Sequence, residues 1–433
     1  MIITVFWSLK EIFNMKRMKV ALVCLLMILL TACSGESEIE YTNIQLNYGA
    51  FRIGDTVYHK TVSGLHRYHA DVPGVMDHFC YDPLCDHSGG DGVCPDCWNL
   101  DSGSYATDGE RIYMNTRSFL TALGGGTWNR YERCIYSFLP DGSDMTLHVS
   151  YDSTNEAQTN LSYRDGYIYF YQSFYEEDYD PAQKGNQDQY VKLMRLDIAT
   201  NGVEEALSAK LLPENRVYLD DTNYYVLHLD NSFLPEDSTL DIFNRESGEA
   251  VKENDKPDGM GVVYVTDYRG ETYFVCFESR ETREYSGTVV LISYALYRYA
   301  EGGYEKLIGN IGDLTGIVFA DGGIWYEPFE FTYIGAKNLP TGVGEETSPY
   351  DFCRYTDGTL ARYDIADGST QIWKLPAWDE GDEVSFYGIS KGNAMVEITN
   401  TQKDFADEPY EAGIYSAQLG EDGEIFLIEK KSD

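Results

Sequence analysis

A short unit, consisting of a tight turn and a following strand, recurs along most of this 433-residue sequence. Its clearest copies lie at residues 108–113, 165–169 and 321–326, and each begins with Asp-Gly. Asp and Gly tolerate the positive backbone angles of a tight hairpin, and tyrosine and isoleucine favour a pleated, half-buried strand. The turns of seven copies fall near residues 54, 109, 166, 223, 270, 322 and 392, at spacings of 47 to 70 residues. The chain must therefore adopt a fold that uses one hairpin unit repeatedly.

The third copy continues over residues 163–207 into a complete small antiparallel sheet. Its later strands are expected at residues 167–171, 193–198 and 203–207, and an Asn-Gly turn precedes the last of them. Second halves of this kind follow several other copies. Four strands per repeat, at a period near fifty residues, are typical of a propeller blade.

One blade cannot bury both of its faces, so neighbouring blades must stack around an axis. The sequence therefore predicts an all-β fold, a β-propeller of four-stranded antiparallel blades over residues 44–431. Seven blades match the copies, and six or eight are the alternatives. The long last spacing indicates an inserted loop at residues 329–349. A β-sandwich array or another β-solenoid is also compatible with the repeat pattern.

The N-terminal region has the features of an export signal. Lys16, Arg17 and Lys19 precede an uncharged apolar run at residues 20–30, and Leu-Thr-Ala-Cys follows, ending at Cys33. A short apolar run followed by small residues is typical of a signal peptide and not of a membrane span. A plain signal peptide or a buried apolar helix is the alternative.

The Leu-Thr-Ala-Cys ending resembles the lipobox of bacterial lipoproteins, in which the cysteine is lipidated and becomes the mature N-terminus. This resemblance implies a signal peptide at residues 1–32, lipidation at Cys33 and a polar tether at residues 33–43. It also implies that the protein is anchored by lipid on the extracytoplasmic side of the cell membrane.

The mature chain would be strongly acidic. Residues 33–433 contain 29 Lys and Arg and 70 Asp and Glu, a net charge of −41. Such a charge argues against nucleic acid and anionic headgroups as partners, because both repel it.

The Asp-Gly-x-x-Ile-Tyr unit is followed by a strand such as residues 134–138 and then by Asp141-Gly142. This succession resembles the blades of TolB-like propellers, and most of all the uncharacterised lipoprotein propellers of anaerobic Gram-positive bacteria. The likeness covers nearly the whole mature chain and implies the propeller fold. The separate N-terminal α/β domain of TolB has no counterpart in this sequence.

A cysteine-rich stretch interrupts the repeats at residues 76–100. Its candidate metal ligands are Cys80, Cys85, Cys94, Cys97 and His87, and their spacing suits a structural zinc site. Two disulfides are the alternative for an exported protein, and a redox role for the Cys-x-x-Cys pair is a third. The remaining cysteines, at positions 134, 276 and 353, fall in strand-like contexts and are expected to be core residues.

No nucleophile elbow, phosphate-binding loop or His-Glu-x-x-His motif occurs in the sequence. The loops of a propeller gather at the ends of its central channel and form a binding face. We therefore expect a non-enzymatic binding or scaffold protein whose partner is a protein, peptide or glycan of the cell envelope. The alternative is a propeller enzyme that acts on envelope glycans or peptides.

Overall fold

The computed structural model describes residues 41–43, 50–61, 64–69, 76–79, 104–117, 131–153, 160–175, 189–229, 237–284, 288–300, 303–312, 316–329, 332–333, 353–354, 359–374, 383–390, 392–399, 413–420 and 425–430. All of them belong to the unit Glu40–Asp433. Their secondary structure is β, apart from turns and one short 3₁₀ helix at Pro257–Gly259.

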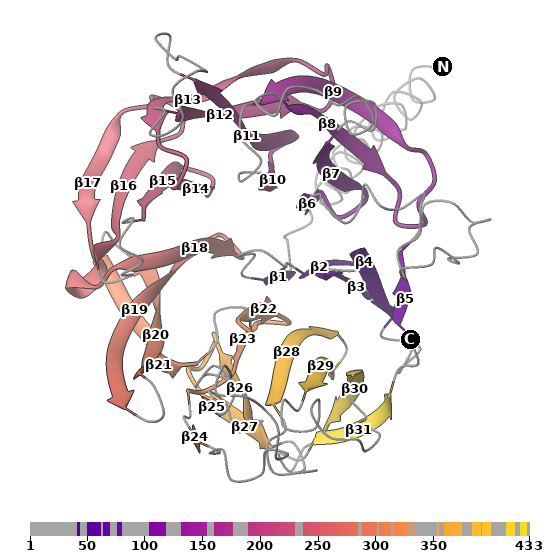
Figure 1. Ribbon diagram of the computed structural model, residues 1–433, viewed down its shortest axis with the longest axis vertical. Coiled ribbons are helices and arrows are strands. Elements are labelled where there is room, and N and C mark those ends of the chain that lie inside the picture. The colour runs from indigo at the N-terminus through magenta and orange to yellow at the C-terminus, as the bar shows by residue number, and fades with distance from the viewer. Residues whose placement is uncertain are drawn as a thin grey trace, which may run out of the picture. The chain divides into compact units, whose positions relative to one another are not determined.

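The described strands form seven antiparallel blades in a ring, which makes the fold a β-propeller (Figure 1). Consecutive strands pair within each blade, and the first strand of a blade lies nearest the ring axis. Blades 1 to 4 consist of β2 (Ala50–Ile53), β3 (Thr56–Thr61), β4 (Gly64–His69) and β5 (Met76–His78); β6 (Ser104–Thr107), β7 (Ile112–Arg117), β8 (Tyr131–Phe138) and β9 (Thr146–Ser153); β10 (Leu161–Arg164), β11 (Tyr167–Tyr175), β12 (Gln189–Asp197) and β13 (Val203–Leu211); and β14 (Arg216–Leu219), β15 (Asn223–His228), β16 (Thr239–Asn244) and β17 (Ala250–Asp255).

Blades 5 to 7 consist of β18 (Val262–Tyr268), β19 (Glu271–Glu284), β20 (Thr288–Ala300) and β21 (Gly303–Ile311); β22 (Val318–Ala320), β23 (Gly323–Tyr326), β26 (Thr359–Asp364) and β27 (Thr370–Lys374); and β28 (Glu383–Ser390), β29 (Asn393–Thr399), β30 (Gly413–Leu419) and β31 (Ile425–Lys430). The predicted all-β propeller of four-stranded blades is confirmed, and so is the blade number.

Two further pairings add to blade 6. β1 (Tyr41–Asn43) pairs antiparallel with β22, with Tyr41 opposite Ala320, and so forms a fifth strand at the inner edge of this blade. β24 (Thr332–Tyr333) and β25 (Cys353–Arg354) form a two-stranded ribbon between β23 and β26. Blade 1 uses the consecutive strands β2 to β5, and blade 7 uses the consecutive strands β28 to β31. Among the described strands, none belongs to both of these blades.

The first hairpin turn of most blades depends on glycine. Backbone φ angles between +58° and +90° occur at the turn glycines 54, 109, 166, 270, 322 and 392. In blades 3, 5 and 6 the preceding residue also has a positive φ, as a two-residue hairpin turn requires. The fourth blade differs: the side-chain carboxylate of Asp220 accepts the amides of Thr222 and Asn223 and shapes the turn. The predicted repeat turns therefore lie at equivalent places.

The hydrophobic core consists of layers between neighbouring blades. Between blades 1 and 2, for example, Phe51 and Tyr58 stack at 5.1 Å and pack with Tyr105 and Phe138. Comparable clusters join blades 2 to 3, 3 to 4, 4 to 5 and 5 to 6. Most tyrosines of the repeats are therefore packing residues. Cys134 and Cys276 are buried free thiols, which confirms the predicted core role for these two cysteines.

Candidate functional site

The residues that the sequence singled out for zinc or disulfides lie outside the described residues. These are Cys80, Cys85, Cys94, Cys97 and His87, and the same holds for the lipidation candidate Cys33. Their roles remain predictions. Among the residues that the structure describes, no group of three or more His, Cys, Asp or Glu side chains is placed to hold a metal ion. In the same residues there is no helix that is long and apolar enough to cross a membrane.

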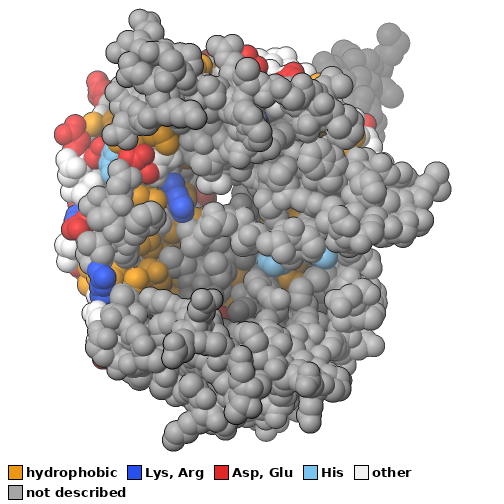
Figure 2. Space-filling model, in the orientation of Figure 1, with side chains coloured by type: hydrophobic (Ala, Val, Ile, Leu, Met, Phe, Trp, Pro, Cys, Tyr) orange, Lys and Arg blue, Asp and Glu red, His pale blue; other side chains and the backbone are white. Residues whose placement is uncertain are grey.

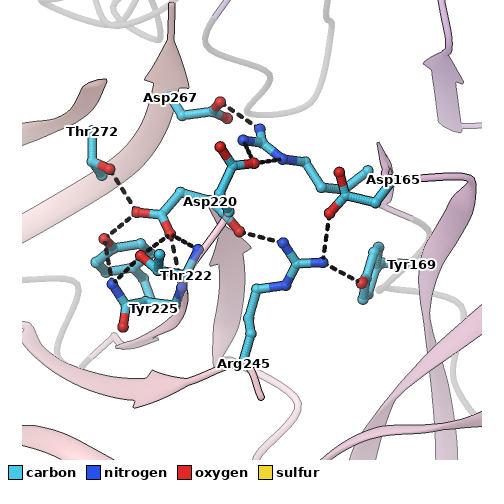
Figure 3. Close-up of polar contacts among 11 residues, drawn as sticks. Asp165, Tyr169, Asp220, Thr222, Tyr225, Arg245, Asp267 and Thr272 are labelled. Atoms are coloured by element: carbon cyan, nitrogen blue, oxygen red, sulfur yellow. Dashed lines mark hydrogen bonds and ion pairs between the residues drawn. The ribbon is translucent and has the colours of Figure 1, made fainter. Parts of the chain in front are cut away.

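An extensive polar network (Figure 3) lies where the first hairpins of blades 3, 4 and 5 turn. We call it the inner-turn cluster. It comprises Arg164, Asp165, Tyr169, Asp220, Asp221, Thr222, Tyr225, Arg245, Asp267 and Thr272.

Arg164, at the end of β10, links three blades. Its Nη1 donates to Asp267 Oδ2 on β18 at 2.5 Å, and its Nε donates to Asp221 Oδ1 in the turn of blade 4 at 2.8 Å. Burial disfavours the charge on Arg164, but the two aspartates outweigh this effect and raise its pKa. Burial also raises the pKa of Asp267, and Arg164 offsets this rise only in part. The guanidinium is therefore held permanently charged between two carboxylates.

Asp220 is the most fully bonded carboxylate of the cluster. Its Oδ2 accepts the hydroxyls of Tyr225 at 2.5 Å and Thr272 at 2.7 Å, while its Oδ1 accepts the amides of Thr222 and Asn223. Burial by itself would raise the pKa of Asp220, but these donors reverse the effect and lower it. Asp220 is therefore an ionised structural centre that ties the turn of blade 4 to β19 of blade 5.

Arg245, after β16, joins blade 4 to blade 3. Its Nη2 donates to Asp165 Oδ2 at 3.1 Å and to the Tyr169 hydroxyl at 2.9 Å, and its Nη1 donates to the Asp220 carbonyl at 2.6 Å. Burial opposes the charge, and the Tyr169 and Asp165 contacts raise the pKa of Arg245 in spite of it.

A comparable link occurs on the other side of the ring. Arg52 on β2 donates through Nη1 to Asp321 Oδ1, in the first turn of blade 6, at 3.0 Å. As with Arg164 and Asp267, the arginine and the aspartate belong to blades separated by one other blade. Ion pairs between first hairpins therefore hold the inner turns together at both places.

Most of the exposed charged side chains at the inner turns are carboxylates, and Arg269 in the first turn of blade 5 is an exposed cation among them. The side chains of Asp165, Asp221 and Asp321 are 48%, 65% and 42% exposed, whereas those of Arg164 and Arg52 are only 13% and 11% exposed. Acidic side chains also gather over the outer parts of blades 3 and 4 (Figure 2). The inner-turn cluster therefore combines a rigid, bonded interior with exposed carboxylates.

A second polar chain has the residue types of a hydrolase triad but not its accessibility. Ser137 Oγ lies 2.8 Å from His148 Nε2, and His148 Nδ1 lies 2.8 Å from Asn201 Oδ1. However, Ser137 is fully buried, and its Oγ also accepts a hydrogen bond from Arg111 Nε at 3.0 Å. A nucleophile must reach its substrate, so this chain is a structural link from blade 2 to the last turn of blade 3.

The sequence predicts the Asp-Gly turns but not the inner-turn cluster, in which only Asp165 belongs to such a turn. Asp165 and Asp321 were visible as turn residues, whereas Asp220, Asp221 and Asp267 were missed. Asp267 lies within β18, and its arginine partner comes from another blade. The Arg164–Asp267 pair spans 103 positions of the chain. Only the curvature of the ring brings such residues together.

The chain matches no family model and no curated protein. Among solved structures it is similar to the β-propeller domain of the trilobed protease from Pyrococcus furiosus, at 15% identity and a TM-score of 0.41, over 76% of this chain and 84% of that one. It is also similar to oligogalacturonate lyase from Vibrio parahaemolyticus, at 10% identity and a TM-score of 0.42, over 88% and 94% of the two chains. A putative TolB from Agrobacterium tumefaciens matches at 10% identity and a TM-score of 0.35, over 62% and 87%. Likeness at this level says nothing about function, and the fold is established by the seven blades themselves.

Proposed function

We propose that this protein is a lipoprotein on the extracytoplasmic side of the cell membrane, and that its propeller binds or scaffolds a cell-envelope partner without catalysing a reaction. The proposal is supported by the hydrogen bonds and ion pairs of the inner-turn carboxylates. The buried ones are occupied by fixed donors, and the exposed ones give the face a negative charge. A rigid charged surface of this kind favours the binding of a partner that carries basic groups.

The anchor is supported by the sequence alone. The basic residues, the short apolar run and the Leu-Thr-Ala-Cys ending are arranged as in lipoprotein signals. A net charge of −41 for the mature chain argues against nucleic acid and favours a basic protein or peptide over an acidic glycan.

An enzyme is the second candidate, and one observation favours it. The pKa of Asp267 is raised, chiefly by burial, while that of the nearby Asp220 is lowered. Carboxylates with pKa values shifted in opposite directions are typical of acid–base pairs. Against this, both carboxylates are already occupied: Asp267 pairs with Arg164, and Asp220 accepts five hydrogen bonds from neighbouring groups. Binding is therefore the better supported function.

The test is to incubate the purified full chain with cell-envelope material and to analyse both the bound fraction and the supernatant by mass spectrometry. We expect a retained partner of unchanged mass, and weaker retention at higher salt because exposed charges are screened. An enzyme would instead release shortened peptides or glycans, and the Asp267→Asn variant would abolish their release. Such products, or the absence of any retained partner at low salt, would contradict the proposal.

A further inference from the structure

The short strand β1 precedes blade 1 in the chain but pairs with blade 6, on the far side of blade 7. It lies at the centre of the ring, close to β2, β18 and its partner β22 (Figure 1). Its three residues stand opposite residues 318–320 of β22 in antiparallel register. The path of β1 therefore determines on which side of the ring the preceding chain joins the propeller.

The chain joins β1 on the face of the ring that carries the first hairpin turns, which we call the inner-turn face. Tyr41, the first residue of β1, is opposite Ala320. Ala320 is the last residue of β22 and is followed directly by the first turn of blade 6. The end of β2 in blade 1 is also close, because Arg52 donates to Asp321 in this turn at 3.0 Å. The N-terminal end of β1 therefore lies among the inner turns.

Without β1 the preceding chain would join the propeller on the opposite face. β2 runs from Ala50 to Ile53 and then turns at Gly54, so Ala50 lies at the end of β2 that points away from the inner-turn face. A chain that led straight into blade 1 would therefore arrive from that opposite face. The pairing of β1 with β22 brings it in through the inner-turn face instead.

The proposed lipid anchor is only a short length of chain away from β1. Cys33 precedes Tyr41 by eight residues, and eight residues span at most ~29 Å in any conformation. β1 is the innermost of the five strands of blade 6, so a path from it over this blade to the rim crosses four strand spacings, or about 19 Å. The remaining ~10 Å is shorter than the outermost strand β27, whose 5 residues extend over about 16 Å. The anchor therefore cannot reach round the rim to the opposite face.

We propose that β1 holds the propeller on the membrane in one orientation, with the inner-turn face toward the bilayer and the opposite face outward. This inference rests on the lipid anchor of the proposed function. The net charge of −41 opposes direct contact with anionic headgroups, so the bilayer itself is not the partner of this face. The partner is instead a protein held in the same membrane, whose basic groups lie within about 29 Å of the bilayer surface.

The test measures the heights of two positions above the bilayer by fluorescence energy transfer. The full chain is purified from cell membranes and placed in phosphatidylcholine vesicles that contain headgroup-labelled acceptor lipids. An azide-bearing amino acid, which carries the donor fluorophore, replaces either Glu246 or Thr282, both of which are exposed.

The two labelled positions lie at opposite ends of the propeller. Glu246 follows Arg245, which bonds the inner turn of blade 4. Thr282 lies near the far end of β19, whose 14 residues start at the inner turn of blade 5 and extend over roughly 40 Å. We therefore expect position 282 to lie ~30 Å farther from the headgroups than position 246, because a twisted strand rises less than its full length.

A variant that lacks the pairing of β1 tests the cause of this orientation. Thr42→Pro together with Asn43→Pro removes a ladder hydrogen bond, since alternate residues donate to the partner in an antiparallel pair. The free tether then runs from Cys33 to Ala50, up to ~61 Å, and joins blade 1 on the opposite face. We expect the height difference to disappear or to change sign. Thr42→Val together with Asn43→Val keeps both amide donors and is the matched control, which should retain the wild-type difference.

The outcomes separate this inference from the proposed function. A full chain that does not associate with the vesicles would refute the lipid anchor, and the orientation with it. A vesicle-bound wild type with equal or reversed heights would overturn the orientation alone. A proline variant that is folded by circular dichroism and keeps the wild-type difference would also overturn it. If the proline variant fails to fold, insertion of about twenty Gly and Ser residues between Cys33 and Tyr41 makes the same test, because a long flexible tether leaves the orientation free.

Discussion

The burial of His59 makes a quantitative prediction about acid stability. Burial, with a smaller contribution from His66, lowers the pKa of His59 to about 3 from the ordinary value of 6.5. Between these two values the unfolded chain binds a proton that the folded chain does not bind. The free energy of unfolding must therefore fall as the pH is lowered through 6.5 and continue to fall down to about pH 3.

The magnitude follows from the two pKa values. Relative to pH 7.5, His59 by itself should lower the free energy of unfolding by about 2 kcal/mol at pH 5 and about 3 kcal/mol at pH 4. The perturbation that isolates this contribution is His59→Gln, which keeps a polar side chain of similar size but cannot take up the proton.

The assay is urea unfolding at pH 7.5 and pH 5, followed by tryptophan fluorescence. We expect the wild type to lose about 2 kcal/mol more than His59→Gln between these pH values. Val57→Ala is the control, because Val57 is also fully buried on β3 but does not titrate, so this variant should keep the pH dependence of the wild type. Equal pH dependence in the wild type and His59→Gln would refute the reasoning.

Three further predictions concern other parts of the molecule. Arg164→Ala should lower the free energy of unfolding by about 2–4 kcal/mol, because it leaves Asp267 without its cation. Arg195→Ala, the control, breaks an exposed pair with Glu204 and should lower the free energy of unfolding by less than about 1 kcal/mol. Equal losses of stability for the two variants in thermal melts would contradict this prediction. Tyr171→Phe should cost about 1–3 kcal/mol by the same measurement, since the buried Tyr171 hydroxyl bonds both the amide and the carbonyl of Val217, and an unchanged melt would show that water replaces it. Cys33→Ala should release the protein from the membrane fraction, and fractionation with membranes as in the wild type would show that the lipidation assignment is wrong.

Much of the blade structure could be predicted because it is determined locally. The hairpin at Asp165-Gly166 needs only positive backbone angles at two adjacent residues, and the strand that follows it is rich in tyrosine, isoleucine and phenylalanine, which favour strands. The strands predicted at residues 167–171 and 193–198 are observed as β11 and β12, which are longer because pairing between them continues to Tyr175 and Gln189.

The remaining features depend on contacts that no local pattern encodes. β1 has only three residues, and its partner β22 lies far away in the chain. The partners of Arg164 and Arg52 belong to blades that only the closed ring brings near. His59 and His66 belong to different strands, and only the strand register shows that they stand opposite each other.

In the proposed function, the exposed carboxylates of the inner turns bind a partner in the cell envelope. The most direct measurement compares two triple variants in capture from cell-envelope extract, each with the same change in net charge. One carries Asp165→Asn, Asp221→Asn and Asp321→Asn at the inner turns, and the other carries Glu204→Gln, Glu205→Gln and Glu305→Gln on outer strands, where each glutamate also pairs with a basic residue. We predict that the inner-turn variant loses the partner that the wild type and the outer-strand variant retain. Equal retention by both variants would contradict the claim.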